Sequence, residues 1–275
     1  MTTGITATDK FPSLTPAEAP LRQARNSAAF WAATGHSRGH EVIRRRGFLA
    51  VDGGERAGLR ILVQEGDLDA GELAELSGLV RRAAGPVNAE DPFGATDLSH
   101  LGLRSWQMPV MLRPPVPASV PASGAGLVPV SVPGPESGGA SGLDVVRVER
   151  VEDLWAAERV VIEGFELAAF EPHRPGELFP VALIERVGVD VFLASHQGVA
   201  AGACVRVVDD GVASHYWVAT SPAFRSRGVG RAVMTASLAD LAQVPATLTA
   251  SKLGRPLYES LGYTAAAPST WWASH

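Results

Sequence analysis

Proline, glycine and serine crowd one stretch of the 275-residue chain, residues 114–142. These 29 residues hold 7 Pro, 6 Gly and 5 Ser, which break helices and strands and leave little apolar surface to bury. Structureless loops longer than ~15 residues are uncommon inside compact domains, so a semi-extended linker is favoured over a long ordered surface loop. We therefore expect a disordered tail at 1–20, an N-terminal domain at 21–113, this linker, and a C-terminal domain at 143–275.

Composition restricts the classes of partner and location. Hydrophobic residues make up 46% of the chain, charged residues make up 19%, and the net charge is −5. Such a chain has no general attraction for phosphate backbones, so we expect no nucleic-acid partner. No stretch reaches the ~18 uninterrupted apolar residues of a membrane helix, and the N-terminus lacks the pattern of a signal peptide. A single cysteine, Cys204, cannot form an internal disulfide, so we expect a reducing cytoplasm.

The C-terminal part alternates between strand and helix patterns. Apolar residues at helical spacing predict helices, and β-branched alternating stretches bounded by turn residues predict strands. In chain order they give strand, helix, three-strand meander, helix, strand, helix and a closing strand or strand pair, an α/β (α+β) arrangement. The ranges are strands at 144–150, 189–195, 199–208, 212–220, 246–250 and 263–272, and helices at 151–170, 228–242 and 255–261.

The sharpest local feature is the segment 225–231, which follows one predicted strand and opens a predicted helix. The first N–H groups of a helix lack internal partners and carry partial positive charge, so they attract anions. Two glycines let a pyrophosphate approach the backbone, and three arginines add positive charge. Taken alone, the pattern also fits a glycine-eased turn with solvated arginines. The segment consists of Arg225, Ser226, Arg227, Gly228, Val229, Gly230 and Arg231.

Two motifs in order resemble those of a known family. Residues 218–230 (VATSPAFRSRGVG) resemble the strand-loop-helix of the GNAT acetyltransferases, whose pattern is an apolar strand end followed by x-Pro-x-x-(Arg/Gln)-x-x-Gly-x-(Gly/Ala). Residues 257–263 (LYESLGY) resemble the late LYExLGF helix of the same family. The resemblance covers nearly all of 143–275. It implies the GNAT fold, a mixed and mostly antiparallel sheet whose fourth and fifth strands start together and splay apart.

The resemblance also implies acetyl-CoA as cosubstrate and transfer of its acetyl group to a primary amine by direct attack. Residues 226–231 would wrap the pyrophosphate. Tyr258 matches the tyrosine that protonates the departing thiolate, although an ordinary core tyrosine fits its pattern too. Ser251 stands where many members carry a cofactor-contacting asparagine, a departure that leaves its role open, although a hydroxyl can still donate a hydrogen bond. Backbone groups of the fourth strand would hold the pantetheine arm at Val218, Ala219 and Thr220.

The sequence leaves the general base open. His215 lies in the predicted fourth strand and, with a pKa near ~6.5, would accept a proton at neutral pH; a packed or surface histidine fits the position equally. A water chain to bulk solvent is a further route. Cys204 has no His/Asp partner at matching spacing and is interpreted as a core residue, and no cluster has metal-ligand spacing. Acids that would attract a cationic amine, or simply be solvated, are Glu163, Glu166, Glu171 and Glu177.

The N-terminal half resembles a partial second copy of the same fold. Residues 98–103 (LSHLGL) line up with 258–263 (YESLGY), a match short enough for coincidence to remain open. Leu98 replaces the tyrosine, and three acids within 65–69 replace the arginine-rich loop. We expect this half to bind no cofactor and to pack on, or shape the acceptor side of, the C-terminal domain. Its predicted elements are a hairpin of 41–51 and 59–64, helices at 70–84 and 97–102, and a strand at 106–113.

These residues fit two classes of function. One is an N-acetyltransferase acting on a small-molecule or peptide amine, as a monomer or homodimer. The other is a non-catalytic acyl-CoA-binding or regulatory module of the same fold, which Ser251 and the lack of an obvious base favour slightly. A doubly wound nucleotide-binding protein is disfavoured, because the glycine loop follows a meander and no convincing acid lies ~20 residues later.

Overall fold

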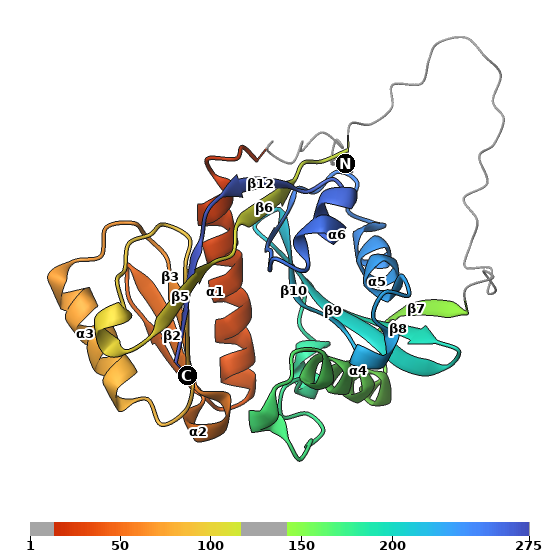
Figure 1. Cartoon of the computed structure of the whole chain (residues 1–275), viewed down its shortest axis with the longest axis horizontal. Coiled ribbons are helices and arrows are strands. Elements are labelled where there is room, and N and C mark those ends of the chain that lie inside the picture. The colour runs from red at the N-terminus through yellow and green to blue at the C-terminus, as the bar shows by residue number, and fades with distance from the viewer. Residues whose placement is uncertain (1–13, 117–141, 275) are drawn as a thin grey trace, which may run out of the picture.

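The computed structural model describes residues 14–116 and 142–274. Two sheets lie on either side of one long central helix, α1 (Ala19–Ser37), as Figure 1 shows. The N-terminal sheet has the strand order β1-β2-β3-β4-β13-β5, and the C-terminal sheet has the order β12-β6-β11-β10-β9-β8-β7. Most of the predicted tail, residues 1–13, and most of the predicted linker, residues 117–141, lie outside the described residues.

The C-terminal half follows the predicted element order. Its parallel pair is β10 with β11, and every other pairing in this sheet is antiparallel, which confirms the expected mixed, mostly antiparallel sheet. The strands are β7 (Leu143–Arg147), β8 (Val189–His196), β9 (Val199–Asp209), β10 (Val212–Thr220), β11 (Ala246–Thr249), β12 (Thr264–Ala267) and β13 (Thr270–Ala273). The helices are α4 (Val151–Gly164), α5 (Val229–Leu238) and α6 (Arg255–Ser260), with single turns η2 (Ala168–Phe170), η3 (Val181–Leu183) and η4 (Pro222–Phe224).

The N-terminal half departs from expectation at several places. Its longest helix, α1, and the short helix at 54–57 were not predicted, and α1 begins inside the expected tail at 1–20. The stretch 41–51 forms two strands rather than one, with a turn at residues 45–47. The stretch 106–113 divides at Pro109, because proline has no N–H to donate to a ladder. One strand, β4, was not predicted at all. The elements are β1 (Glu41–Arg44), β2 (Phe48–Asp52), α2 (Gly54–Ala57), β3 (Leu59–Val63), α3 (Ala70–Arg82), β4 (Val87–Asp91), η1 (Ser99–Leu101), β5 (Arg104–Gln107) and β6 (Val110–Arg113).

The two halves exchange their closing strands. Strand β6 leaves the N-terminal half and pairs with β11 and β12 of the C-terminal sheet. Strand β13, the last of the chain, crosses in the opposite direction and pairs with β4 and β5. Figure 1 shows the blue C-terminal strand lying among the orange and yellow strands of the N-terminal sheet. Each sheet is therefore completed by a strand from the other half.

The halves also share an element order. Helix, three-strand meander, helix, strand, helical turn and two strands run from α1 to β6, and the same series runs from α4 to β13. Each series contains one parallel pair, β3 with β4 and β10 with β11. Strand β7 and the single turns η2, η3 and η4 lack counterparts among the described elements of the N-terminal half, and α2 lacks one in the C-terminal half. The mixed α/β architecture thus has a GNAT-like arrangement preceded by a partial domain with a similar element order.

One hydrophobic core joins the two halves around α1. Its buried members include Phe30 and Trp31 of α1, Leu49 of β2, Val161 of α4 and Val205 of β9. Burying a side chain such as Phe30 contributes roughly 1.5–3 kcal/mol. The helix α1 therefore packs against both halves. Exposing this face of the C-terminal sheet to solvent would also disrupt the packing of the N-terminal half.

Candidate active site

Strand β10 is irregular near its end. Its register with β9 shifts between Tyr216 and Ala219, and Trp217 within this bulge has a φ of +52°. Its partner on the other side, β11, pairs only at Ala213 and Ser214. From His215 to Thr220 the strand therefore has no ladder partner on the side of β11 among residues 14–116 and 142–274. The predicted splay of these two strands is present, and it leaves backbone N–H and C=O groups near Val218 free to bind a ligand.

The segment after β10 turns sharply into helix α5. Ser226 and Gly228 have φ values of +62° and +80°, and Gly228 occupies the N-cap position. No side chain caps this helix, so the N–H groups of its first turn keep the donor capacity that a helix start always has. The helix also packs very close to the sheet: a Cβ on Gly202 of β9 would lie 2.4 Å from Cγ1 of Val229. The loop is therefore pinned beside the free edge of β10.

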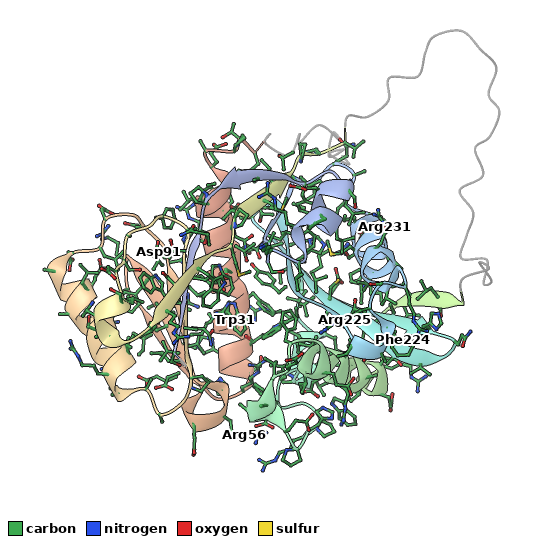
Figure 2. All side chains as sticks on the ribbon, in the orientation of Figure 1. Trp31, Arg56, Asp91, Phe224, Arg225 and Arg231 are labelled. Atoms are coloured by element: carbon green, nitrogen blue, oxygen red, sulfur yellow. The ribbon has the colours of Figure 1, made fainter. Side chains whose placement is uncertain are left out.

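Three exposed arginines surround this helix start, and two of them have protein partners. Arg225 donates to the carbonyl of Gly164 at 3.1 Å, and Arg231 donates to the hydroxyl of Ser260 at 2.9 Å. The guanidinium of Arg227 lies 5.7 Å from the ring centre of Phe224. Figure 2 shows Arg225 and Arg231 on the same side of the molecule, at the two ends of this region. The arrangement suits a diphosphate, because donors and positive charge converge on an uncapped helix.

Tyr258 lies next to the same strand. It is buried, it belongs to one apolar cluster with Val229, and Val218 packs against that cluster. Its ring stands edge-on to Tyr263 with 6.0 Å between the ring centres. Burial raises the pKa of the Tyr258 phenol above its ordinary value, and the Cys204 thiol raises it further. The phenol therefore keeps its proton at neutral pH and can act as a proton donor.

Ser251 has a local structural contact. Its hydroxyl accepts a hydrogen bond from the N–H of Gly254 at 3.1 Å, and its carbonyl accepts one from the N–H of Arg255 at 3.0 Å. The side chain is exposed. These bonds form the turn that starts α6, the short helix carrying Tyr258. Ser251 thus supports the tyrosine, and its predicted contact with the cofactor stays a prediction.

The environment of His215 corrects our interpretation of it as a candidate base. The ring is buried, with Nε2 at 3.0 Å from the Ser237 hydroxyl and Nδ1 at 3.1 Å from the Tyr263 hydroxyl. Burial lowers the pKa of His215 to about 3, and the nearby Arg206 and Arg113 lower it further. A neutral imidazole whose two nitrogens are both engaged in the core has no free site for an amine proton, so we assign it a structural role.

Cys204 is also part of the core. It is fully buried, and burial raises the pKa of its thiol to about 12, so no thiolate forms at neutral pH. Within residues 14–116 and 142–274, no group of three or more His, Cys, Asp or Glu side chains is arranged to hold a metal ion. No helix in that part of the chain is long and apolar enough to span a membrane.

In the N-terminal half, two carboxylates cap the helix start that corresponds to the loop at 225–231. Helix α3 occupies the topological position of α5, but Asp69 at its N-cap accepts from the N–H of Glu72 at 2.8 Å, and Glu72 accepts from the N–H of Asp69 at 3.2 Å. This capping box satisfies the donors that a phosphate would need. Leu98 at the position of Tyr258 is buried in the apolar core. The N-terminal half therefore lacks both the uncapped helix start and the tyrosine of the C-terminal site.

The sequence identified Glu163, and the structure adds the aromatic residues around it. The Glu163 carboxylate accepts from the hydroxyl of Ser221, the residue after β10, at 3.1 Å. Phe165, 47% exposed, stands edge-on to Trp217 with 5.3 Å between ring centres, and Trp217 stands edge-on to Trp31 at 5.6 Å. These rings cover the bulge of β10 from the side of α1. No motif pointed to them, because their meeting depends on the bulge.

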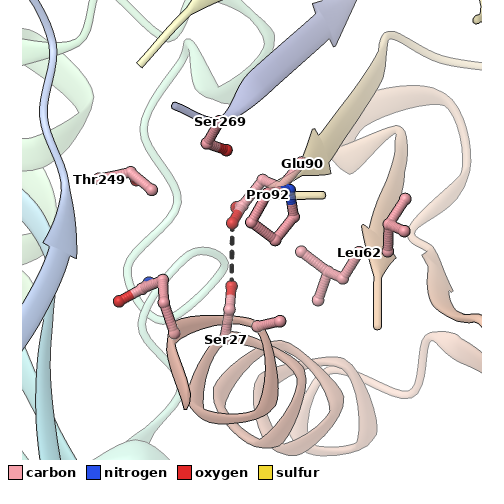
Figure 3. Close-up of a pocket in the computed structure, with 9 residues that line it drawn as sticks. Ser27, Leu62, Glu90, Pro92, Thr249 and Ser269 are labelled. Carbon is pink, nitrogen blue, oxygen red and sulfur yellow. Dashed lines mark hydrogen bonds between the residues drawn. The ribbon is translucent and has the colours of Figure 1, made fainter. Parts of the chain in front are cut away.

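Two hollows in the structure contain none of the predicted site residues. The first is a small cavity between the halves, of about 10 Å³, lined by residues that include Ser27, Glu90, Thr249 and Ser269. Figure 3 shows the Ser27 hydroxyl bonded to the Glu90 carboxylate at its rim. Its size suits at most one water molecule. The second, of about 320 Å³, is an open hollow beside β7 and η3.

Comparison with known proteins agrees with this geometry. Residues 188–265 match the sequence model of the Acetyltransferase (GNAT) domain. This part of the chain is similar to a GNAT acetyltransferase domain. The match begins at the start of β8 and runs through the splayed strands, the loop at 225–231 and α6, so it covers the described site. No curated protein matches the sequence.

Solved structures share the fold over both halves. A GCN5-related N-acetyltransferase from Kribbella flavida is 17% identical with a TM-score of 0.51, and the match covers 90% of this chain and 95% of that one. A GNAT-family protein from Novosphingobium aromaticivorans is 17% identical with a TM-score of 0.51, over 84% and 89% of the two chains. A functionally unknown protein from Staphylococcus epidermidis is 9% identical with a TM-score of 0.51, over 86% and 94%. The fold of the two halves together thus recurs in solved structures.

Proposed function

We propose that this chain is an acetyl-CoA-dependent N-acetyltransferase that transfers the acetyl group to a primary amine of a small molecule or peptide. One arrangement carries the proposal: the uncapped, arginine-flanked start of α5 lies beside the unpaired edge of β10. The first feature suits the diphosphate of CoA, and the second suits the amide-containing pantetheine arm. Tyr258 lies in the same apolar cluster as Val229 at the start of that helix.

The chemistry needs a neutral amine, a polarised carbonyl and a proton for the departing sulfur. The amine lone pair attacks the thioester carbonyl carbon, the carbon–sulfur bond breaks, and its electrons leave on sulfur. A backbone N–H near Val218 would stabilise the charge on the carbonyl oxygen. The protonated phenol of Tyr258 would donate its proton to the thiolate. Since His215 is held in the core, the proton lost by the ammonium group would leave through water.

CoA binding tests this proposal directly. Gly230 is the second residue of α5, and an acid there would place a negative charge within the diphosphate site. We expect Gly230→Glu to weaken CoA binding at least about tenfold in calorimetry. Gly71→Glu is the matched control, because Gly71 is the second residue of α3 and has no role in the site. Absence of CoA binding by the folded wild type, or equal binding by Gly230→Glu, would contradict the proposal.

The alternative function is a non-catalytic acyl-CoA-binding or regulatory module. Two observations favour it: His215 is unavailable as a base, and Ser251 replaces an asparagine and serves a turn. Thioester consumption with a broad panel of amines separates the two functions, provided that CoA binding is measured in parallel. An enzyme consumes acetyl-CoA with at least one amine, whereas the module binds CoA without turnover.

We further propose that the N-terminal half is a partial second copy of the domain that has lost its cofactor site. The shared element order supports a copy, and the capping box at α3 together with buried Leu98 supports the loss. Calorimetry tests the loss, because a single CoA should bind each chain. A stoichiometry of two would contradict it.

A further inference from the structure

The segment that joins α4 to β8 begins beside the bulge of β10. The last residue of α4, Gly164, lies so close that a Cβ on it would stand 3.0 Å from Cβ of Ala219. Phe165 follows directly and contacts Trp217. Residues 165–188 contain only the single turns η2 and η3, so no ladder of hydrogen bonds fixes their path. Other contacts must hold this segment in place.

From the side of α4, one buried carboxylate organises the segment. Glu158 is fully buried, and its oxygens accept three backbone N–H groups: Gly176 at 2.8 Å, Leu178 at 2.6 Å and Phe179 at 2.9 Å. Nε2 of His173 lies 3.0 Å from the same carboxylate. Four contacts to one charged group define a single path for residues 173–179.

From the other side, two arginines of the N-terminal half reach the same stretch, at Glu177 and Leu178. Arg56 of α2 donates to both oxygens of Glu177, through Nε at 2.6 Å and Nη2 at 2.8 Å. Arg38, which follows α1, donates to the carbonyl of Leu178. Burial lowers the pKa of Arg38 to about 10, and Glu158 and Glu177 oppose that change, so the guanidinium stays charged at neutral pH. Figure 2 shows Arg56 at the lower edge of the N-terminal half, next to this segment.

Apolar contacts also join this segment to α1. Phe170, Leu178 and Phe179 of the segment belong to the buried cluster that includes Trp31 of α1. Trp31 in turn stands against Trp217 in the bulge. The N-terminal half therefore touches the segment within residues 170–179. It also touches β10 directly, because Phe30 stacks on Tyr216 with 4.6 Å between ring centres and Asn26 accepts a hydrogen bond from the Tyr216 hydroxyl at 2.8 Å. It makes these contacts on the face of the sheet opposite to α5 and the anion-binding loop, which belong to a separate cluster.

We propose that Arg56 and Arg38 are positioning residues, which clamp residues 165–179 against β10 so that this segment forms a wall of the acceptor-amine site. The proposal rests on the proposed function for the identity of the acceptor. It gives the N-terminal half a defined role, since the C-terminal half supplies the CoA site and the N-terminal half fixes the surface that the amine meets. The pair Arg56–Glu177 is the part of the clamp that substitution can remove without opening the core.

Hydrogen exchange tests the clamp without any substrate. We expect Arg56→Ala to speed exchange of the backbone N–H groups in 171–179 about fivefold, because a two-point, partly buried ion pair is lost. Arg45→Ala is the matched control: Arg45 makes a similar two-point pair with Glu75, at 2.6 and 2.5 Å, elsewhere in the N-terminal half. The double exchange Arg56→Glu with Glu177→Arg should restore slow exchange. Unchanged exchange in Arg56→Ala would overturn the clamp.

Kinetics test the role in the acceptor site. In Arg56→Ala we expect the KM for the amine to rise about fivefold while the KM for acetyl-CoA stays unchanged, with recovery in the charge-exchanged double variant. Faster exchange with an unchanged amine KM would overturn the acceptor-wall assignment. Loss of CoA binding by the wild type would overturn the proposed function and this assignment together, whereas hydrogen exchange would still decide whether the clamp exists.

Discussion

The backbone of Gly254 lies against the ring of Tyr258, so closely that a Cβ at position 254 would stand 2.9 Å from Cε2 of that ring. Gly254 is the N-cap of α6, and it therefore helps to set where the phenol points. We expect Gly254→Ala to move the ring and lower kcat about tenfold or more, because small misplacements of a proton donor are costly. The KM for acetyl-CoA should change little. Steady-state kinetics measure both.

A glycine in a helix without a nearby ring is the control for this substitution. At Gly78 of α3, an added Cβ would meet only the end of the Arg82 side chain, at 3.4 Å. Gly78→Ala should leave kcat unchanged and add about 0.5–1 kcal/mol of stability. Equal kcat values for Gly254→Ala and the wild type would show that the position of the Tyr258 ring does not limit turnover.

Removing the hydroxyl of Tyr258 should affect turnover far more than cofactor affinity. General acids typically contribute ~10²–10⁴-fold, so Tyr258→Phe should lower kcat by that order while calorimetry gives an unchanged CoA affinity. Burial raises the pKa of this phenol above its ordinary value of about 10, so it stays protonated through the neutral range. Below about pH 10, the pH–rate profile of Tyr258→Phe should therefore have the same shape as that of the wild type, with a lower kcat at every pH. Unchanged activity would exclude the tyrosine as the acid.

Much of the C-terminal half could be predicted because its signals are local. Strand β10 has the predicted bounds, and α5 begins one residue after its predicted start. Gly198 and Gly211 lie between the strands of the predicted meander, and their positive φ angles are typical of glycine in tight turns. By contrast, β4 was missed because it ends in Glu90 and Asp91, two acids that are buried. Their partners, Ser27 and Thr96, come from elsewhere in the chain or from a later turn, so no local pattern predicts the burial.

Some features of the candidate site were also visible in the sequence, whereas others depend on contacts between distant parts of the chain. The loop that we propose to bind a diphosphate could be predicted because its glycines and arginines are adjacent in sequence. For His215 the sequence left a base and a packed residue equally open, because its identity and its strand are visible in the sequence but its core partners Ser237 and Tyr263 are not. The exchange of β6 and β13 was also hidden, since alternation defines which face of a strand is apolar but not which strand lies beside it.

The buried state of His215 should make the protein less stable in acid. Its folded pKa of about 3 lies below the unfolded value of about 6.5, so between these values the unfolded chain binds a proton that the folded chain does not. The stability present above pH 6.5 is therefore lost as the pH falls toward 3. From pH 7.5 to pH 5 we expect this residue alone to remove roughly 2 kcal/mol, measured by urea unfolding.

Substitution isolates that contribution. His215→Gln cannot titrate, so its stability should change less between pH 7.5 and pH 5 than that of the wild type, whatever its absolute value. His100→Gln, at an exposed position in η1, should keep the wild-type pH dependence. An identical pH dependence in all three proteins would mean that the His215 ring is not held neutral in the core.

The exchanged strands and the shared core around α1 should make the two halves unfold together. Trp272 of β13 is 6% exposed and packs in the core of the N-terminal sheet, although it lies at the end of the C-terminal half. Trp272→Ala should cost about 3–5 kcal/mol. In Trp272→Ala, hydrogen exchange measured at increasing urea concentrations should show β3 and β9 losing protection at the same urea midpoint. That midpoint should be lower than the midpoint of the wild type. Trp106→Ala, on neighbouring β5 and 41% exposed, should shift the midpoint little. Opening of β3 while β9 stays protected would contradict the coupling, because it would mean that each sheet holds its borrowed strand without support from the other.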